Sequence, residues 1–194
     1  GREARKLELL LAEAQACGGR TRLTRGARQS NHCRQTAAAA ACYGFGCSLV
    51  LGAEPPAASN GNVLLDRLLG AELVWARGRN PEAVLQEAFE QAQAAGRSPY
   101  LIPYGGSSPL GAAAYAEAMH EFLDQGVDID VIVLATSSGG TQAGLVAGAR
   151  LHGYRGRVLG ISVDQSAGAL RPRIAALAEA VGDVLGESLR VSPD

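Results

Sequence analysis

Short apolar stretches that suit β-strands alternate along this chain with longer stretches that suit α-helices. The helical stretches place apolar residues at the spacing i, i+3, i+4 and i+7, first at Leu7, Leu10, Leu11 and Ala14. Strands are predicted over residues 20–26, 47–52, 72–77, 99–103, 131–136 and 157–163, and helices over 5–16, 30–43, 62–69, 81–95, 110–125, 142–152 and 170–181. Because strands that alternate with helices build βαβ units, we expect an α/β fold with mainly parallel sheets and helices on both faces, a three-layer arrangement.

The composition excludes several classes of protein. With 47% hydrophobic and 19% charged residues, the 194 residues can bury a substantial core, which excludes a disordered chain. The net charge is -1 and the arginines are scattered, so nucleic acid is not an expected partner. The longest apolar runs are shorter than the roughly 18–20 residues that span a bilayer. We therefore expect no membrane partner and a cytoplasmic protein.

The cysteines and histidines do not have the spacing of a metal site. The four cysteines include no CxxC pair, and the histidines are His32, His120 and His152. We therefore expect no metal. The thiols of Cys17, Cys33, Cys42 and Cys47 are expected to be free and mostly buried, because reduced cysteine behaves as a small hydrophobic residue.

The loop that follows the strand predicted over 131–136 is the clearest candidate for an anion site. Its sequence, ATSSGGTQAG, leads into a helix, and its small residues let backbone N–H groups approach an anion at the positive end of the helix dipole. The hydroxyl groups of Ser138 and Thr141 would add donors. The loop has neither the lysine of a Walker motif nor the GxGxxG order of a dinucleotide-binding motif. The alternative to a phosphate site is a glycine-rich turn with a serine N-cap.

A second polar loop, GARQSNHCRQ, leads into the helix predicted over 30–43. Backbone N–H groups of Ser30, Asn31 and His32 could bind a carboxylate there, and the side chain of Ser30 or Asn31 could bind a ring oxygen or move a proton. The structural alternative is that Ser30 caps the helix and His32 packs in the core. Ligands of open α/β sheets gather at the carboxyl ends of strands. A phosphate site and a carboxylate site together indicate an amino-acid substrate and a phosphorylated cofactor.

Five motifs, in order, resemble the family of D-cysteine desulfhydrase and 1-aminocyclopropane-1-carboxylate (ACC) deaminase. They are RKLELLLAEA, GARQSNHCRQTAAAAA, SNGNVLLDRLLGAELV, PYLIPYGGSSPLGAAAYAEA and SSGGTQAGLVAG. SNHCRQ and GGSSPLG resemble the desulfhydrase branch. The resemblance implies the tryptophan-synthase β fold (fold type II), pyridoxal 5′-phosphate (PLP) as cofactor, and elimination of sulfide from D-cysteine to give pyruvate and ammonia. ACC deamination and loss of sulfite from cysteate stay open.

The same resemblance implies a role for each candidate residue. Asn31 would bind the phenolic oxygen of PLP. Ser30, with the backbone of Asn31 and His32, would hold the substrate carboxylate, and Ser30 would assist proton movement. The residues that would hold the cofactor phosphate are Ser137, Ser138, Gly139, Gly140 and Thr141.

The position of the lysine that binds PLP is the main departure from the family. The family motif GGNKxRKLE places that lysine two residues before the arginine, where this chain has Glu3. Glutamate cannot form the covalent bond, so either a modified lysine between Glu3 and Ala4 is missing from the sequence or the residue is truly replaced. Lys6, the only lysine, is shifted by about three residues along the helix and is expected to be solvated or ion-paired.

The resemblance also implies a longer protein and a division into two lobes. The family extends beyond both ends of this chain, so we expect the smaller lobe in residues 1–103 and part of the larger lobe in residues 104–194, with the segment YGGSSPLG as the hinge. A homodimer is implied as well. The competing hypothesis to an enzyme is a relic without the lysine that binds PLP or an amino acid reversibly. A third hypothesis is an inactive fragment.

Overall fold

A computed structural model describes residues 2–193 and confirms the α/β architecture. Every predicted strand and helix is present in the predicted order. The strands are β1 (Thr21–Gly26), β2 (Gly46–Leu51), β3 (Glu72–Trp75), β4 (Pro99–Leu101), β5 (Val131–Thr136) and β6 (Arg157–Ser162). The helices are α1 (Arg2–Ala16), α2 (Asn31–Cys42), α3 (Gly61–Leu68), α4 (Pro81–Ala94), α5 (Pro109–Asp124), α6 (Gly140–Leu151) and α7 (Ala167–Leu185), with a short 3-10 helix, η1 (Tyr104–Gly106).

The chain forms two compact units. Unit 1 contains the residues up to Leu9 and those from Gly106 onward, and unit 2 contains Leu10–Gly105. The division between Gly105 and Gly106 lies in the segment YGGSSPLG. That residues 1–103 and 104–194 correspond to the two lobes of a longer protein stays a prediction.

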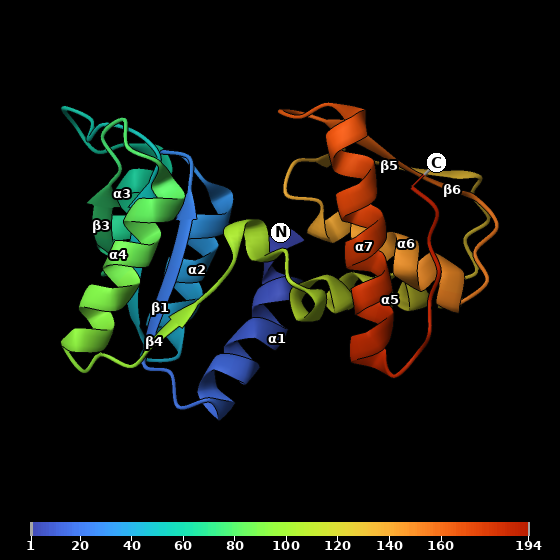
Figure 1. Ribbon diagram of the computed structural model, residues 1–194, viewed down its shortest axis with the longest axis horizontal. Coiled ribbons are helices and arrows are strands. Elements are labelled where there is room, and N and C mark those ends of the chain that lie inside the picture. The colour runs from blue at the N-terminus through green and yellow to red at the C-terminus, as the bar shows by residue number, and fades with distance from the viewer. Residues whose placement is uncertain (1, 194) are drawn as a thin grey trace. The chain divides into compact units, whose positions relative to one another are not determined.

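Unit 2 is built on a four-stranded parallel sheet with the order β3-β2-β1-β4. The register pairs Thr21 of β1 with Gly46 of β2 and with Pro99 of β4. Consecutive strands therefore run outward from β1 through β2 to β3, and β4 returns to the opposite side of β1 (Figure 1). This reversal of strand order is the kind of point at which α/β sheets bind ligands.

Both faces of the unit 2 sheet are covered, as the three-layer prediction requires. Alternate residues of a strand point to opposite faces. Leu49 and Leu51 of β2 pack with Ala37 of α2 and Val63 of α3. Val50, between them, packs in a separate cluster formed with α4: Leu23, Val50, Ala76, Val84, Leu85, Ala88 and Ala92. The sheet is thus buried between α2 with α3 on one face and α4 on the other.

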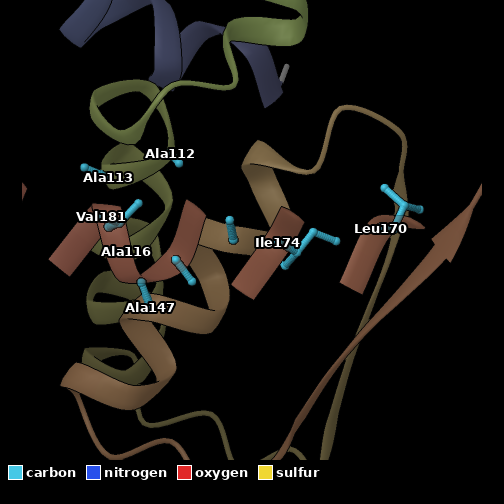
Figure 2. Packing of buried hydrophobic residues seen from close by; sticks show 9 residues of the cluster. Ala112, Ala113, Ala116, Ala147, Leu170, Ile174 and Val181 are labelled. Atoms are coloured by element: carbon cyan, nitrogen blue, oxygen red, sulfur yellow. The ribbon is translucent and has the colours of Figure 1, made fainter. Parts of the chain in front are cut away.

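Unit 1 has a helical core of small residues. Its cluster joins α5, α6 and α7 and contains Ala112, Ala113, Ala116, Ala143, Ala147, Leu170, Ile174, Ala178 and Val181 (Figure 2). Small side chains allow helices to pack closely, and here the approach requires glycine. A Cβ atom on Gly144 would collide with the carbonyl oxygen of Ala112, and one on Gly148 would lie 2.7 Å from that of Ala116. The glycines of α6 therefore set the distance between α5 and α6.

The second sheet, β5-β6, is parallel and lies in unit 1. Among the residues that the structure describes it has two strands, and one of its faces exposes Val131, Val133, Leu159, Ile161 and Val163. The expectation of helices on both faces therefore holds for unit 2 but not for this sheet. No helix within residues 2–193 is long and apolar enough to cross a membrane.

The expectation that most thiols are buried is wrong for half of them. Cys33 and Cys47 are buried in the cluster between the unit 2 sheet and α2, whereas Cys17 and Cys42 are exposed. Both exposed cysteines lie at the ends of helices, Cys17 just after α1 and Cys42 at the last residue of α2. Chain termination of a helix brings its last residues to the surface, a position that the apolar character of cysteine does not predict.

Candidate functional site

Helix α6 begins two residues earlier than predicted, so Gly140 and Thr141 form its first turn. Its N-cap, Gly139, has a φ angle of 90° and offers no side chain. The first helical hydrogen bond runs from Ala143 N–H to Gly139 O, at 2.9 Å, so the N–H groups of Thr141 and Gln142 precede the first helical acceptor. These groups, at the positive end of the helix dipole, are suited to an anion.

The start of α6 differs from the starts of the other capped helices. Four helices begin with a serine or asparagine whose side chain accepts a backbone N–H: Ser30 for α2, Asn80 for α4, Ser108 for α5 and Ser166 for α7. At α6 the hydroxyl of Ser107 accepts only the N–H of Gly140, at 3.0 Å, and donates to Ser138 Oγ, at 2.7 Å. The alternative of a serine-capped turn therefore does not describe this loop.

Two glycines are required to bring the loop to this conformation. The positive φ angle of Gly139 is one that residues with a side chain rarely adopt. A Cβ atom on Gly140 would collide with Ser107 Oγ and would lie 2.9 Å from Ser107 Cα. The close approach of Ser107, which belongs to the loop before α5, thus depends on glycine at position 140.

The side chain of Ser137 is engaged outside the anion loop. Its hydroxyl donates to Asp164 Oδ2, at 2.5 Å, and its carbonyl oxygen accepts a hydrogen bond from Arg173 Nη2, at 2.6 Å. Arg173 also donates to Gln165 Oε1, at 3.1 Å. Sequence reasoning missed Asp164, Gln165 and Arg173, because they follow β6 and become neighbours of the loop only through the pairing of β5 with β6.

In unit 2, the side chains of Ser30 and His32 both serve the fold. Ser30 Oγ accepts the N–H of Cys33, at 3.1 Å, and so caps α2. The His32 ring is buried, with Nε2 at 2.9 Å from Thr24 Oγ1. Thr24 gives its own proton to the carbonyl oxygen of Ile102, at 2.8 Å, so the proton of the His32 contact must come from Nε2. The roles of Ser30 and His32 toward a substrate stay predictions.

Asn31, between them, is exposed and belongs to a network of amide groups. Its Oδ1 accepts a hydrogen bond from Asn62 Nδ2, at 3.1 Å. Asn62 Nδ2 also donates to the carbonyl oxygen of Gln29, at 2.8 Å, and Gln29 Oε1 accepts the N–H of Asn62, at 2.7 Å. Sequence reasoning did not connect Gln29 or Asn62 with Asn31. The motif SNGN, with an asparagine on either side of Gly61 at a helix start, was the available signal.

The loops after β1 and β4 meet beside this network, at the reversal of strand order. The guanidinium of Arg25, at the end of β1, lies 4.6 Å from the centre of the Tyr104 ring, which follows β4. Arg25 Nε also contacts Glu82 Oε2, at 2.5 Å. The aromatic contact holds the two loops together at the carboxyl ends of adjacent strands, where an α/β sheet presents its ligand site.

Lys6 is buried, so the expectation of a solvated lysine is wrong and its ion-paired alternative is confirmed. Its side chain is 3% exposed, and Nζ lies 3.9 Å from Glu3 Oε2, one turn earlier in α1. The ammonium also lies 5.9 Å from the centre of the Tyr115 ring. Both contacts stabilise the charged form of the amine and hold it within unit 1.

Three further titratable groups are buried between the unit 2 sheet and its helices. Burial raises the pKa of Cys33 and of Cys47 to about 12, so neither thiol is a nucleophile at neutral pH. Burial also raises the pKa of Asp66 to about 6, against the opposing charge of Arg34. Within the described part of the chain, no three His, Cys, Asp or Glu side chains are grouped as metal ligands would be.

Comparison with known proteins identifies the class. A family model described as pyridoxal-phosphate dependent enzyme matches residues 2–190. The chain belongs to this family, and pyridoxal phosphate is the cofactor that the family uses.

Its relatives define the branch. The chain is 40% identical over 195 residues to D-cysteine desulfhydrase of Klebsiella pneumoniae (strain 342), covering 95% of this chain and 59% of the relative. It is 37% identical over 198 residues to a putative ACC deaminase of Pyrococcus abyssi (strain GE5 / Orsay), covering 98% of this chain and 59% of the relative. This chain is therefore shorter than these relatives by about two fifths of their length.

Solved structures support the fold. The structure of an ACC deaminase homologue matches with a TM-score of 0.92 and 34% identity, over 100% of this chain and 60% of the other. A threonine deaminase structure matches with a TM-score of 0.66 and 24% identity, over 97% and 56% of the two chains. The resemblance stated from the motifs and the fold-type-II architecture are thereby confirmed.

Proposed function

We propose that the protein to which this chain belongs uses PLP to break down a small amino acid of the D-cysteine or ACC type, as a carbon–sulfur lyase or deaminase. The relatives named above support the reaction class. The observation that carries the proposal is the start of α6, which leaves N–H groups for an anion where the other helices have a side-chain cap.

The residues of the α6 loop fit a phosphate group. Backbone N–H groups at Thr141 and Gln142 and the hydroxyl groups of Ser138 and Thr141 would hold it, with Gly139 and Gly140 allowing close approach. Ser137 would contribute through its backbone, because its hydroxyl is bonded to Asp164. When bound, PLP supplies an electron sink for the bonds that break at the α-carbon of an amino acid.

The start of α2 fits the remaining oxygens. Asn31 would donate to the ring oxygen of the cofactor, and the first turn of α2 would orient the substrate carboxylate. Ser30, as the N-cap, would hold that turn in place and move a proton at its hydroxyl. His32 would support the turn through Thr24. On the side of unit 2, substrate and cofactor would thus meet hydrogen-bond donors.

Covalent attachment does not fit the residues present. The position of the family lysine holds Glu3, and Lys6 is buried beside it. We therefore assign no step to a lysine. This observation favours a second candidate function, reversible binding of PLP or an amino acid without turnover.

One experiment separates the two candidates. The full-length protein is incubated with PLP and either D-cysteine or ACC, and sulfide, pyruvate and ammonia are measured. A second sample is reduced with borohydride and its peptides are mapped by mass spectrometry. Inorganic phosphate serves as a competitor for PLP.

We expect sulfide and pyruvate from D-cysteine, and a pyridoxyl adduct between Glu3 and Ala4 if a modified lysine stands there. PLP binding with phosphate competition, but with neither product nor adduct, would establish the second candidate. A protein that fails to bind PLP at all would overturn both.

A further inference from the structure

We propose that Asn62 is a positioning residue that holds the side-chain amide of Asn31 with its NH2 group facing away from α3, so that Asn31 can act only as a donor toward a ligand. This inference rests on the proposed function, in which Asn31 contacts an oxygen of the cofactor. It assigns a role to Asn62, which lies on a different helix from Asn31 and is 31 residues away in sequence.

The orientation follows from a group that can only accept. The carbonyl oxygen of Gln29 has no proton, so the Asn62 atom 2.8 Å from it must be the nitrogen, Nδ2. The same nitrogen lies 3.1 Å from the side chain of Asn31, and a donor there requires an acceptor, Oδ1. Since the oxygen and nitrogen of an amide lie on opposite sides of Cγ, Asn31 Nδ2 faces away from Asn62.

Gln29 is itself fixed by the same kind of constraint. The backbone N–H of Asn62 can only donate, so the Gln29 atom 2.7 Å from it is Oε1. Gln29 Nε2 then faces Asn60, with its carbonyl oxygen at 3.3 Å and its Oδ1 at 3.1 Å. The network therefore has one orientation for each amide, and neither Gln29 nor Asn62 can rotate without losing a bond.

The backbone between the two asparagines depends on this clamp. Gly61 has a φ angle of 52°, and a Cβ atom on it would lie 2.6 Å from Gln29 Oε1. The sequence Asn60-Gly61-Asn62 is thus packed against Gln29, which explains the missing side-chain cap of α3: Gln29 accepts the N–H that an N-cap would otherwise take. The turn is a support for Asn31 as well as the start of a helix.

The consequence for recognition is a preference for acceptors. The Asn31 NH2 group stands at the first residue of α2, where the helix dipole is positive. A phenolate or carboxylate oxygen satisfies it, and a donor group on the ligand does not. Without Asn62, the amide of Asn31 could turn and offer either atom.

Asn62→Asp tests the proposal, because a carboxylate accepts and cannot donate. Asn31 would then turn its NH2 toward position 62 and present Oδ1 to the ligand. The matched control is Asn60→Asp, which adds the same charge to the same network but keeps the acceptor that Gln29 Nε2 uses. The full-length protein carries each change, alone and in combination with Asn31→Ala, and thermal melting confirms that every variant folds.

The first readout needs no cofactor: the side-chain NH2 resonances of Asn31 in a 15N–1H NMR spectrum. We expect them to move downfield in Asn62→Asp and to stay in place in Asn60→Asp. The second readout is PLP affinity, which we expect Asn62→Asp to weaken about tenfold, the effect of losing a hydrogen bond to a charged oxygen. In the Asn31→Ala background the same change should have almost no effect.

Equal weakening of PLP binding by both Asp variants, or the full effect of Asn62→Asp in the Asn31→Ala background, would overturn the inference. Unchanged Asn31 resonances in Asn62→Asp would overturn it too. A shift of these resonances in a protein that binds no PLP would keep the positioning role and count against the proposed function instead.

Discussion

Asp66 is the residue whose environment most opposes its usual chemistry. Its side chain is 1% exposed, and neither carboxylate oxygen has a hydrogen-bond partner among the described residues. It lies on α3, whose Val63 packs in the cluster with Cys33 and Cys47. Burial without partners penalises the charged form, which explains the raised pKa of about 6.

This pKa makes stability fall as pH rises. In the unfolded chain Asp66 loses its proton near its ordinary pKa of 3.8, whereas the folded protein keeps it up to about 6. Between these values the folded state binds more protons, so the free energy of unfolding decreases with pH, and the penalty is complete above pH 6. Asp66→Asn should therefore raise stability at pH 8 by about 1–3 kcal/mol and should have little effect below about pH 4.

Urea unfolding at both pH values measures this difference, with Glu54→Gln as the control. Glu54 is an exposed acid of the same unit, and its replacement should leave stability nearly unchanged at either pH. A stabilisation by Asp66→Asn that is as large at pH 4 as at pH 8 would mean that ionisation of Asp66 is not the cause.

At the scale of elements, α6 performs two tasks with one series of glycines. Gly140, Gly144 and Gly148 recur at every fourth position and so lie on one side of the helix. The last two bring α6 against α5, and the first admits Ser107 to the start of the helix. The packing of α6 and the shape of the proposed phosphate loop therefore depend on the same helix face.

Gly144→Ala should destabilise unit 1 more than helix propensity alone would suggest. The added methyl group would collide with the Ala112 carbonyl, and such overpacking costs about 1–3 kcal/mol, which exceeds the gain in helix propensity. Gly168→Ala in α7 is the matched control, because its Cβ would have no atom within 4 Å. Thermal melting should show a lower midpoint for the first variant and an unchanged or higher one for the second.

The elements show what local sequence can predict. The order and type of all strands and helices followed from apolar spacing and turn residues, which act over a few neighbours. The start of α6 did not, because Gly140 joins the helix with Ser107, 33 residues earlier, bonded to its N–H. For the same reason Asn62 and Asp164 were missed, and the burial of Lys6 beneath Tyr115 was not foreseen: each depends on a contact made only in the folded chain.

At the scale of the whole molecule, the open face of β5-β6 is the most conspicuous apolar surface. Val133, Ile161 and Val163 are 60%, 53% and 66% exposed and belong to neighbouring strands, so they form a continuous patch rather than scattered residues. A two-stranded sheet is also marginal by itself. This face is where a polypeptide limited to residues 1–194 is expected to associate.

Replacing Val133 and Ile161 together by threonine should reduce that association. Threonine keeps the β-branched shape that suits a strand and removes part of the apolar area. We expect the polypeptide of residues 1–194 to bind the dye ANS and to sediment as assemblies larger than a monomer, and the double variant to do both less. Val184→Thr, at an exposed position of α7, is the control. Equal dye binding by all three proteins would place the sticky surface elsewhere.

The single lysine described above has a practical consequence for labelling. Aldehydes, active esters and other amine-directed reagents normally decorate many surface lysines, which creates a background that hides a specific adduct. Residues 1–194 offer one side-chain amine, and it is sequestered against Glu3 and Tyr115. An adduct on a lysine side chain in this stretch would therefore have a single address in the printed sequence, and adventitious modification would be almost silent there.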